Sequence, residues 1–136
     1  MADTMSTSTT PVAEGLFAHR ILLVEDNDMA CRGLARLLEA WGFQVTVKHD
    51  GTSALRALDS DPPPDFVLTD LSLPDLDGRE VALHAHGLQP TPRIALITGW
   101  DLDCDLVNYQ SWGIDWVFPK PLDTKSLINR LREPRP

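Results

Sequence analysis

The sequence predicts an α/β fold in which a five-stranded parallel sheet carries helices on both faces. The first observation is alternation: short apolar segments take turns with longer segments whose apolar residues recur at helical spacing. Strands that alternate with helices form parallel sheets, and strands covered on both faces are apolar throughout. The second observation is size, because 136 residues with 43% hydrophobic residues suffice for one domain with one core.

Two strands and two helices are expected in the first half of the chain. An apolar run predicts a strand over 20–24, and alternating polarity predicts another over 43–47. Between them 28–42 is predicted to be helical, since its apolar residues share one face: Ala30, Leu34, Leu37, Leu38 and Trp41. A shorter helix is expected over 52–58, and the proline-rich break at 61–64 follows it.

The second half continues the alternation. Strands are expected over 65–70, 93–98 and 116–118. Helices are expected over 78–88, 102–112 and 123–132. The first of these helices has the weakest apolar pattern, whereas the last begins at Asp123, a residue type that caps helix N-termini.

Composition excludes several classes of function. The net charge is -8 and no long cluster of Lys and Arg occurs, which argues against direct nucleic-acid binding. No apolar run approaches the roughly 20 residues that a membrane span needs. The two cysteines, Cys31 and Cys104, lack metal-type spacing and indicate reduced thiols in the cytoplasm.

The domain boundaries follow from the two ends of the chain. Residues 1–18 are rich in Ser and Thr and are predicted to form a disordered leader. Residues 133–136 are expected to be a non-helical tail because of their prolines. The folded domain is therefore predicted to span 19–132.

Polar side chains gather where the predicted strands end. The first strand leads into Glu25 and Asp26, the third ends at Asp70, the fourth ends at Thr98, and the fifth leads into Lys120. Parallel strands end at one edge of the sheet, which is where sites form in such folds. Each residue also has a plainer explanation: Asp26 or Asp28 could cap the next helix, and Asp70 could start a turn.

Taken together, these residues predict a phosphoryl-transfer site. Three clustered carboxylates repel one another, and Mg²⁺ relieves that repulsion because it prefers hard oxygen ligands. A carboxylate beside such a metal can act as a nucleophile. Lys120 and the Thr98 hydroxyl could then stabilise the transferring oxygens.

Four motifs carry a resemblance to a known family: ILLVEDN, LTDLSLPDLDG, IALIT and FPKP. In order, residue type and spacing they are similar to those of CheY-like receiver domains of two-component response regulators, over roughly residues 19–132. The resemblance implies a flavodoxin-like (βα)₅ fold. It also implies that Asp70 accepts a phosphoryl group from a sensor histidine kinase or a histidine phosphotransfer protein.

The same resemblance implies roles for the remaining site residues. Mg²⁺ would be bound by Glu25, Asp26, Asp70 and the backbone carbonyl of Ser72. Thr98 matches the switch hydroxyl, and Lys120 matches the lysine that pairs with the phosphate. Pro74 and Gly78 match the turn residues of the acidic loop, and Pro121 would follow a cis Lys-Pro bond.

The resemblance further implies partners and a mode of action. The domain would catalyse only its own phosphorylation and dephosphorylation, and it would switch contacts with a downstream effector. A homodimer through the fourth helix, fifth strand and fifth helix is a further candidate. The sequence departs from the family at Val117, where Tyr or Phe is usual.

Two questions stay open at the level of sequence. A phosphorylation-independent pseudo-receiver that acts as a protein-binding module is the alternative function, although the presence of every site residue argues against it. The cognate kinase and the output are not readable, since the chain fits either a stand-alone regulator or part of a longer one.

Overall fold

The structure is a computed structural model that describes residues 19–99 and 109–133. The predicted leader 1–18, residues 102–108 of the predicted fourth helix, and Cys104 lie outside the described residues. The boundaries predicted for the leader and the tail therefore remain predictions.

Five parallel strands form one sheet in the order β2-β1-β3-β4-β5, as the sequence predicts. The strands are β1 (Arg20–Val24), β2 (Gln44–Lys48), β3 (Phe66–Asp70), β4 (Arg93–Thr98) and β5 (Trp116–Pro119). All five residues of the central β3 are buried, which explains its unbroken run of apolar and β-branched residues up to Asp70.

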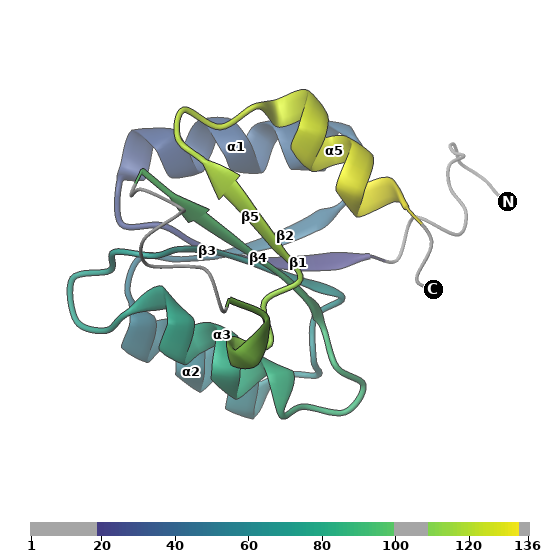
Figure 1. Cartoon of the computed structure of the whole chain (residues 1–136). Coiled ribbons are helices and arrows are strands. Elements are labelled where there is room, and N and C mark those ends of the chain that lie inside the picture. The colour runs from purple at the N-terminus through teal and green to yellow at the C-terminus, as the bar shows by residue number, and fades with distance from the viewer. Residues whose placement is uncertain (1–18, 100–108, 134–136) are drawn as a thin grey trace, which may run out of the picture.

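Helices cover both faces of the sheet (Figure 1). On one face lie α1 (Asp28–Ala40) and α5 (Thr124–Arg132), and on the other lie α2 (Gly51–Ser60) and α3 (Gly78–His86). Successive strand residues point to opposite faces, so β1 sends Ile21 and Leu23 into the first core and Leu22 and Val24 into the second. The predicted doubly wound architecture is confirmed.

The predicted helix over 102–112 is only partly within the described residues. Its last part, Tyr109–Trp112, forms a short 3-10 helix, η2. The other predicted helices and strands are all present, with ends that differ from the predictions by at most two residues. Asp123 caps α5 as expected, because its side chain accepts hydrogen bonds from the N–H groups of Lys125 and Ser126.

The apolar face predicted for α1 is only partly the face that the structure buries, since Leu38 is the one predicted residue that is fully buried. The buried residues are Cys31, Ala35 and Leu38, whereas Ala30 is exposed and Trp41 is 46% exposed. Small side chains at 31 and 35 allow the helix to approach the sheet closely. The bulkier Leu34 packs at the margin of the core, and Trp41 instead stacks against the guanidinium of Arg132.

Candidate functional site

The carboxylates lie together at the carboxyl edge of the two central strands. Val24 of β1 pairs with Thr69 of β3, so that Glu25 and Asp70, one residue further on, emerge side by side. Asp26 follows Glu25 in the same loop, and carboxylate oxygens of Glu25, Asp26 and Asp70 all lie within 4.8 Å of one another. Within the described ranges this is the one cluster of acidic, His or Cys ligands that could hold a metal ion.

The cluster combines buried and exposed carboxylates. Glu25 is 9% exposed and Asp70 is 6% exposed, whereas Asp26 is open to solvent. Burial raises the pKa of Glu25, and the nearby charge of Asp70 adds to this effect. The raised pKa persists although the Asn27 N–H donates to Glu25 Oε2 at 3.0 Å, which favours the charged form. The site thus holds negative charge at a cost, which a bound cation would relieve.

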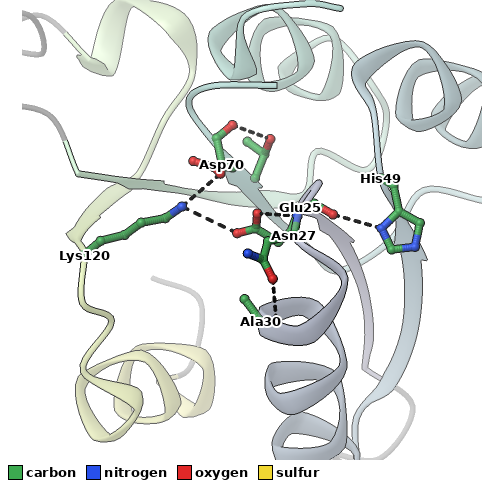
Figure 2. Close-up of polar contacts among 7 residues, drawn as sticks. Glu25, Asn27, Ala30, His49, Asp70 and Lys120 are labelled. Carbon is green, nitrogen blue, oxygen red and sulfur yellow. Dashed lines mark hydrogen bonds and ion pairs between the residues drawn. The ribbon is translucent and has the colours of Figure 1, made fainter. Parts of the chain in front are cut away.

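Lys120 supplies a cation to this cluster from the far side of β3 (Figure 2). Its Nζ donates to Asp70 Oδ2 at 2.9 Å and lies 3.6 Å from Glu25 Oε1. Burial alone would lower the pKa of Lys120, but the hydrogen bond and charge of Asp70, together with Glu25, outweigh burial and raise it. The ammonium therefore stays protonated over the ordinary pH range.

The ends of β4 and β5 bring Thr98 and Lys120 to the same edge. Asp70 pairs with Ile97 and Thr98 pairs with Pro119, so the Thr98 backbone lies between β3, which ends at Asp70, and β5, which leads into Lys120. The Lys120 N–H also donates to the Thr98 carbonyl at 2.8 Å. Thr98 is buried at 1% exposed, and the Lys120-Pro121 peptide bond is cis as the resemblance implies.

The loop after β3 carries Ser72 and closes tightly at Gly78. Ser72 pairs with Asp77 in an isolated antiparallel bridge, and the Gly78 N–H donates to the Leu71 carbonyl at 2.7 Å. Gly78 lies so close to the Asp70 carbonyl that a Cβ there would overlap it. Glycine is therefore required at this position, and α3 then begins with a capping box between Asp77 and Glu80.

The motifs and the geometry agree with one protein family. Residues 21–132 match the family described as the response regulator receiver domain. The chain belongs to this family. It is 35% identical over 113 residues to Response regulator MprA of Mycobacterium tuberculosis, a match that covers 83% of this chain and 49% of MprA. The chain spans about half the length of the curated relatives it matches.

Solved receiver domains share the fold. One from Methylobacillus flagellatus is 31% identical with a TM-score of 0.75, covering 85% of this chain and 97% of that one. The receiver domain of a sensor histidine kinase from Pseudomonas aeruginosa PAO1 is 28% identical with a TM-score of 0.74, covering 85% of this chain and 95% of that one. That structure holds a magnesium ion in its active site cleft.

In this receiver domain the first helix is capped by a residue that the sequence-based prediction did not single out. Asn27, rather than Asp26 or Asp28, caps α1, because its side-chain oxygen accepts from the Ala30 N–H at 2.9 Å. Asp28 instead pairs with Arg32 one turn later, at 2.6 Å. The Asp26 carboxylate is thus left for the acidic cluster.

Val117 lies on a different face from its aromatic neighbours. It packs against the α2 and α3 side of the sheet, whereas Trp116 and Phe118 belong to the α1 and α5 side. The Arg93 guanidinium lies 4.5 Å from the Trp116 ring centroid. Because strand residues alternate, Trp116 cannot occupy the place of the family's usual aromatic without a change in strand register.

Two further residues touch the site's loops and were not predicted from sequence. His49 Nδ1 lies 3.0 Å from the Glu25 carbonyl oxygen, and Asp75 binds the start of α2. In the sequence Asp75 stands out only as part of a turn motif, and His49 does not stand out at all. Neither contact is visible in a local pattern, because each joins residues more than 20 positions apart.

A cleft of about 350 Å³ adjoins the acidic cluster. Its polar lining includes Glu25, Asn27 and Lys120, and its apolar lining comes from α1, β4 and the segment before α5, with Leu34, Leu37, Ile97 and Leu122. None of the helices in the described ranges is long and apolar enough to cross a membrane.

Proposed function

We propose that this receiver domain accepts a phosphoryl group on Asp70 in a Mg²⁺-dependent reaction. One observation carries the proposal: the buried Asp70 carboxylate lies within 4.8 Å of two further carboxylates and 2.9 Å from the Lys120 ammonium. A carboxylate that is held between a cation and a metal-binding cluster is suited to nucleophilic attack on phosphorus.

The donor set fits Mg²⁺. Glu25, Asp26 and Asp70 offer hard carboxylate oxygens, and the backbone carbonyl of Ser72 is a fourth candidate ligand from the loop that follows. Such a partial cage leaves positions for water and phosphate oxygens, which Mg²⁺ retains readily. When bound, the ion would neutralise charge on the phosphoryl oxygens.

The protein's own residues then have separate tasks. An Asp70 oxygen attacks phosphorus, the new O–P bond forms as the donor's P–N bond breaks, and the released imidazole takes up a proton. Lys120 already faces Asp70 and would pair with a phosphoryl oxygen, while the Thr98 hydroxyl would donate a hydrogen bond to another. A donor imidazole would approach Asp70 through the cleft beside Lys120.

The partners follow from this chemistry and from the family. The phosphodonor is a sensor histidine kinase or a histidine phosphotransfer protein in the cytoplasm. Phosphorylation changes contacts with a downstream effector or with a second copy of the chain through the face that includes β5 and α5 (Figure 1). The presence of acceptor, metal ligands, Thr98 and Lys120 argues against the alternative of a phosphorylation-independent binding module.

Acetyl phosphate labelling tests the proposal. We expect one hydroxylamine-labile adduct in the presence of Mg²⁺, and none in EDTA or in Asp70→Asn. Asp65→Asn is the matched control, since it makes the same substitution at the opposite end of β3, where Asp65 accepts from the Arg20 N–H. Full labelling of Asp70→Asn would refute the assignment of the acceptor.

A further inference from the structure

The segment 49–52, which joins β2 to the first turn of α2, is hydrogen-bonded to both loops that carry candidate metal ligands. On one side His49 Nδ1 lies 3.0 Å from the Glu25 carbonyl oxygen (Figure 2). On the other side the segment is held by Asp75, three residues after Ser72. We infer that Asp75 is a positioning residue that fixes the Ser72 loop against this segment and thereby sets the affinity for Mg²⁺; this inference rests on the proposed function.

The Asp75 side chain binds the first turn of α2 through three hydrogen bonds. Its Oδ1 accepts from the Gly51 N–H at 2.7 Å, and its Oδ2 accepts from the Thr52 N–H at 2.9 Å and from the Thr52 hydroxyl. The N-cap of this helix, Asp50, already accepts from the Ser53 N–H at 2.7 Å. Asp75 therefore satisfies further free N–H groups of the first turn from a loop more than 20 residues away.

The charge state of Asp75 agrees with this geometry. Hydrogen bonds from the Thr52 hydroxyl, the Thr52 N–H and the Gly51 N–H lower the pKa of Asp75 to about 2. The side chain is thus a carboxylate at all ordinary pH values, and the N-terminal end of a helix favours such a charge.

Apolar packing also holds the loop that carries Asp75 against the start of α2, at a junction formed by Gly51, Thr52, Asp75 and Leu76. A Cβ on Gly51 would lie 2.5–2.7 Å from three carbon atoms of Leu76, including its Cβ, so the loop could not keep its place beside α2. Gly51 is 24 residues from Asp75 in sequence, yet both the hydrogen bonds and the packing bring the two segments together. Hydrogen bonds to Asp75 and packing against Leu76 therefore both hold the loop after β3 to the start of α2.

This junction bears on the metal because it limits how Ser72 can move. Ser72 is also tied to Asp77 by the antiparallel bridge, so the loop is held at its base and at Asp75. A carbonyl ligand that is held in place before binding loses less freedom when the ion arrives. Residues that orient metal ligands commonly affect metal affinity by about 10–100-fold.

The experiment compares Mg²⁺ dissociation constants by calorimetry in folded, full-length variants. Asp75→Ala removes the three hydrogen bonds that Asp75 accepts from the first turn of α2. Asp61→Ala removes the same charge at the opposite end of α2. Thr52→Val and Gly51→Ala disturb the junction without any change in charge. We expect Mg²⁺ binding to weaken about tenfold in Asp75→Ala, less in Thr52→Val and Gly51→Ala, and not in Asp61→Ala.

Hydrogen exchange of the 72–77 amides, measured in EDTA, reads the junction independently of the metal. Exchange should be faster in Asp75→Ala, Thr52→Val and Gly51→Ala than in the wild type. Unchanged exchange, or Mg²⁺ affinities in the two neutral variants equal to that of the wild type, would overturn the inference. A wild-type protein that bound no Mg²⁺ would instead contradict the proposed function. The exchange data would still show whether Asp75 holds the Ser72 loop in place.

Discussion

Removal of the Lys120 ammonium should destabilise the metal-free protein and strengthen its binding of Mg²⁺. Lys120→Met keeps most of the side-chain volume but leaves Asp70 and Glu25, both largely buried, without their cation. The Nζ-to-Oδ2 distance of 2.9 Å gives a Coulomb attraction of about 6 kcal/mol at an effective dielectric of about 20, and about 1.4 kcal/mol in water. Because the Lys120 side chain is 40% exposed, and desolvation offsets part of the attraction, we expect a loss of about 1–3 kcal/mol.

Urea unfolding in EDTA and in saturating Mg²⁺ measures both effects. In EDTA the unfolding midpoint of Lys120→Met should fall, whereas Lys125→Met, which removes an exposed lysine near the start of α5, should have little effect. In Mg²⁺ the gap between Lys120→Met and the wild type should shrink, since the ion replaces the lost cation. Each tenfold gain in Mg²⁺ affinity would restore about 1.4 kcal/mol. A variant as stable as the wild type in EDTA, or a gap that Mg²⁺ leaves unchanged, would refute this account of the site.

Three further predictions follow from the same site. Glu25→Gln combined with Asp26→Asn removes two of the three clustered carboxylates, so calorimetry should show Mg²⁺ affinity reduced by more than about 100-fold while the fold persists. The pKa of Glu25 is raised in the folded state. The metal-free wild type therefore loses stability as the pH rises from the ordinary pKa of a glutamate through the raised pKa. Thermal unfolding of Glu25→Gln in EDTA should therefore show an advantage over the wild type that grows across this window and is constant at more acid pH. Finally, Val117→Tyr places an aromatic on the α3 side of β5 and should change effector or self-association affinity more than the rate of acetyl phosphate labelling.

The core of the site was predictable from sequence because parallel strands end at one edge. Once β1 and β3 are recognised, the residues that follow them must emerge together, and the structure places the oxygens of Glu25, Asp26 and Asp70 within 4.8 Å. Lys120 reaches the same cluster since the strand order puts β5 only two strands from β3. The apolar pattern of the strands and their order in the sheet therefore leave few other places for these side chains.

Other features depend on contacts that a linear pattern does not encode. The helical spacing of α1 allows neighbouring faces, and only the close approach to the sheet selects Cys31 and Ala35 over the larger Leu34 and Leu37. Asp75 reads as an ordinary turn residue, because its partners Gly51 and Thr52 lie on another element. For the N-cap of α1 the sequence offered Asp26 or Asp28, whereas the structure has Asn27, which lies between them, in that position.

The most direct test of the central claim is the position of the phosphoryl group. After labelling with acetyl phosphate and Mg²⁺, borohydride reduction converts the acyl phosphate into a stable alcohol that peptide mass spectrometry can locate. The account predicts that the modified residue is Asp70 alone, and that the modification disappears in EDTA. A modification at Glu25, Asp26 or any other carboxylate, or equal labelling without Mg²⁺, would contradict it.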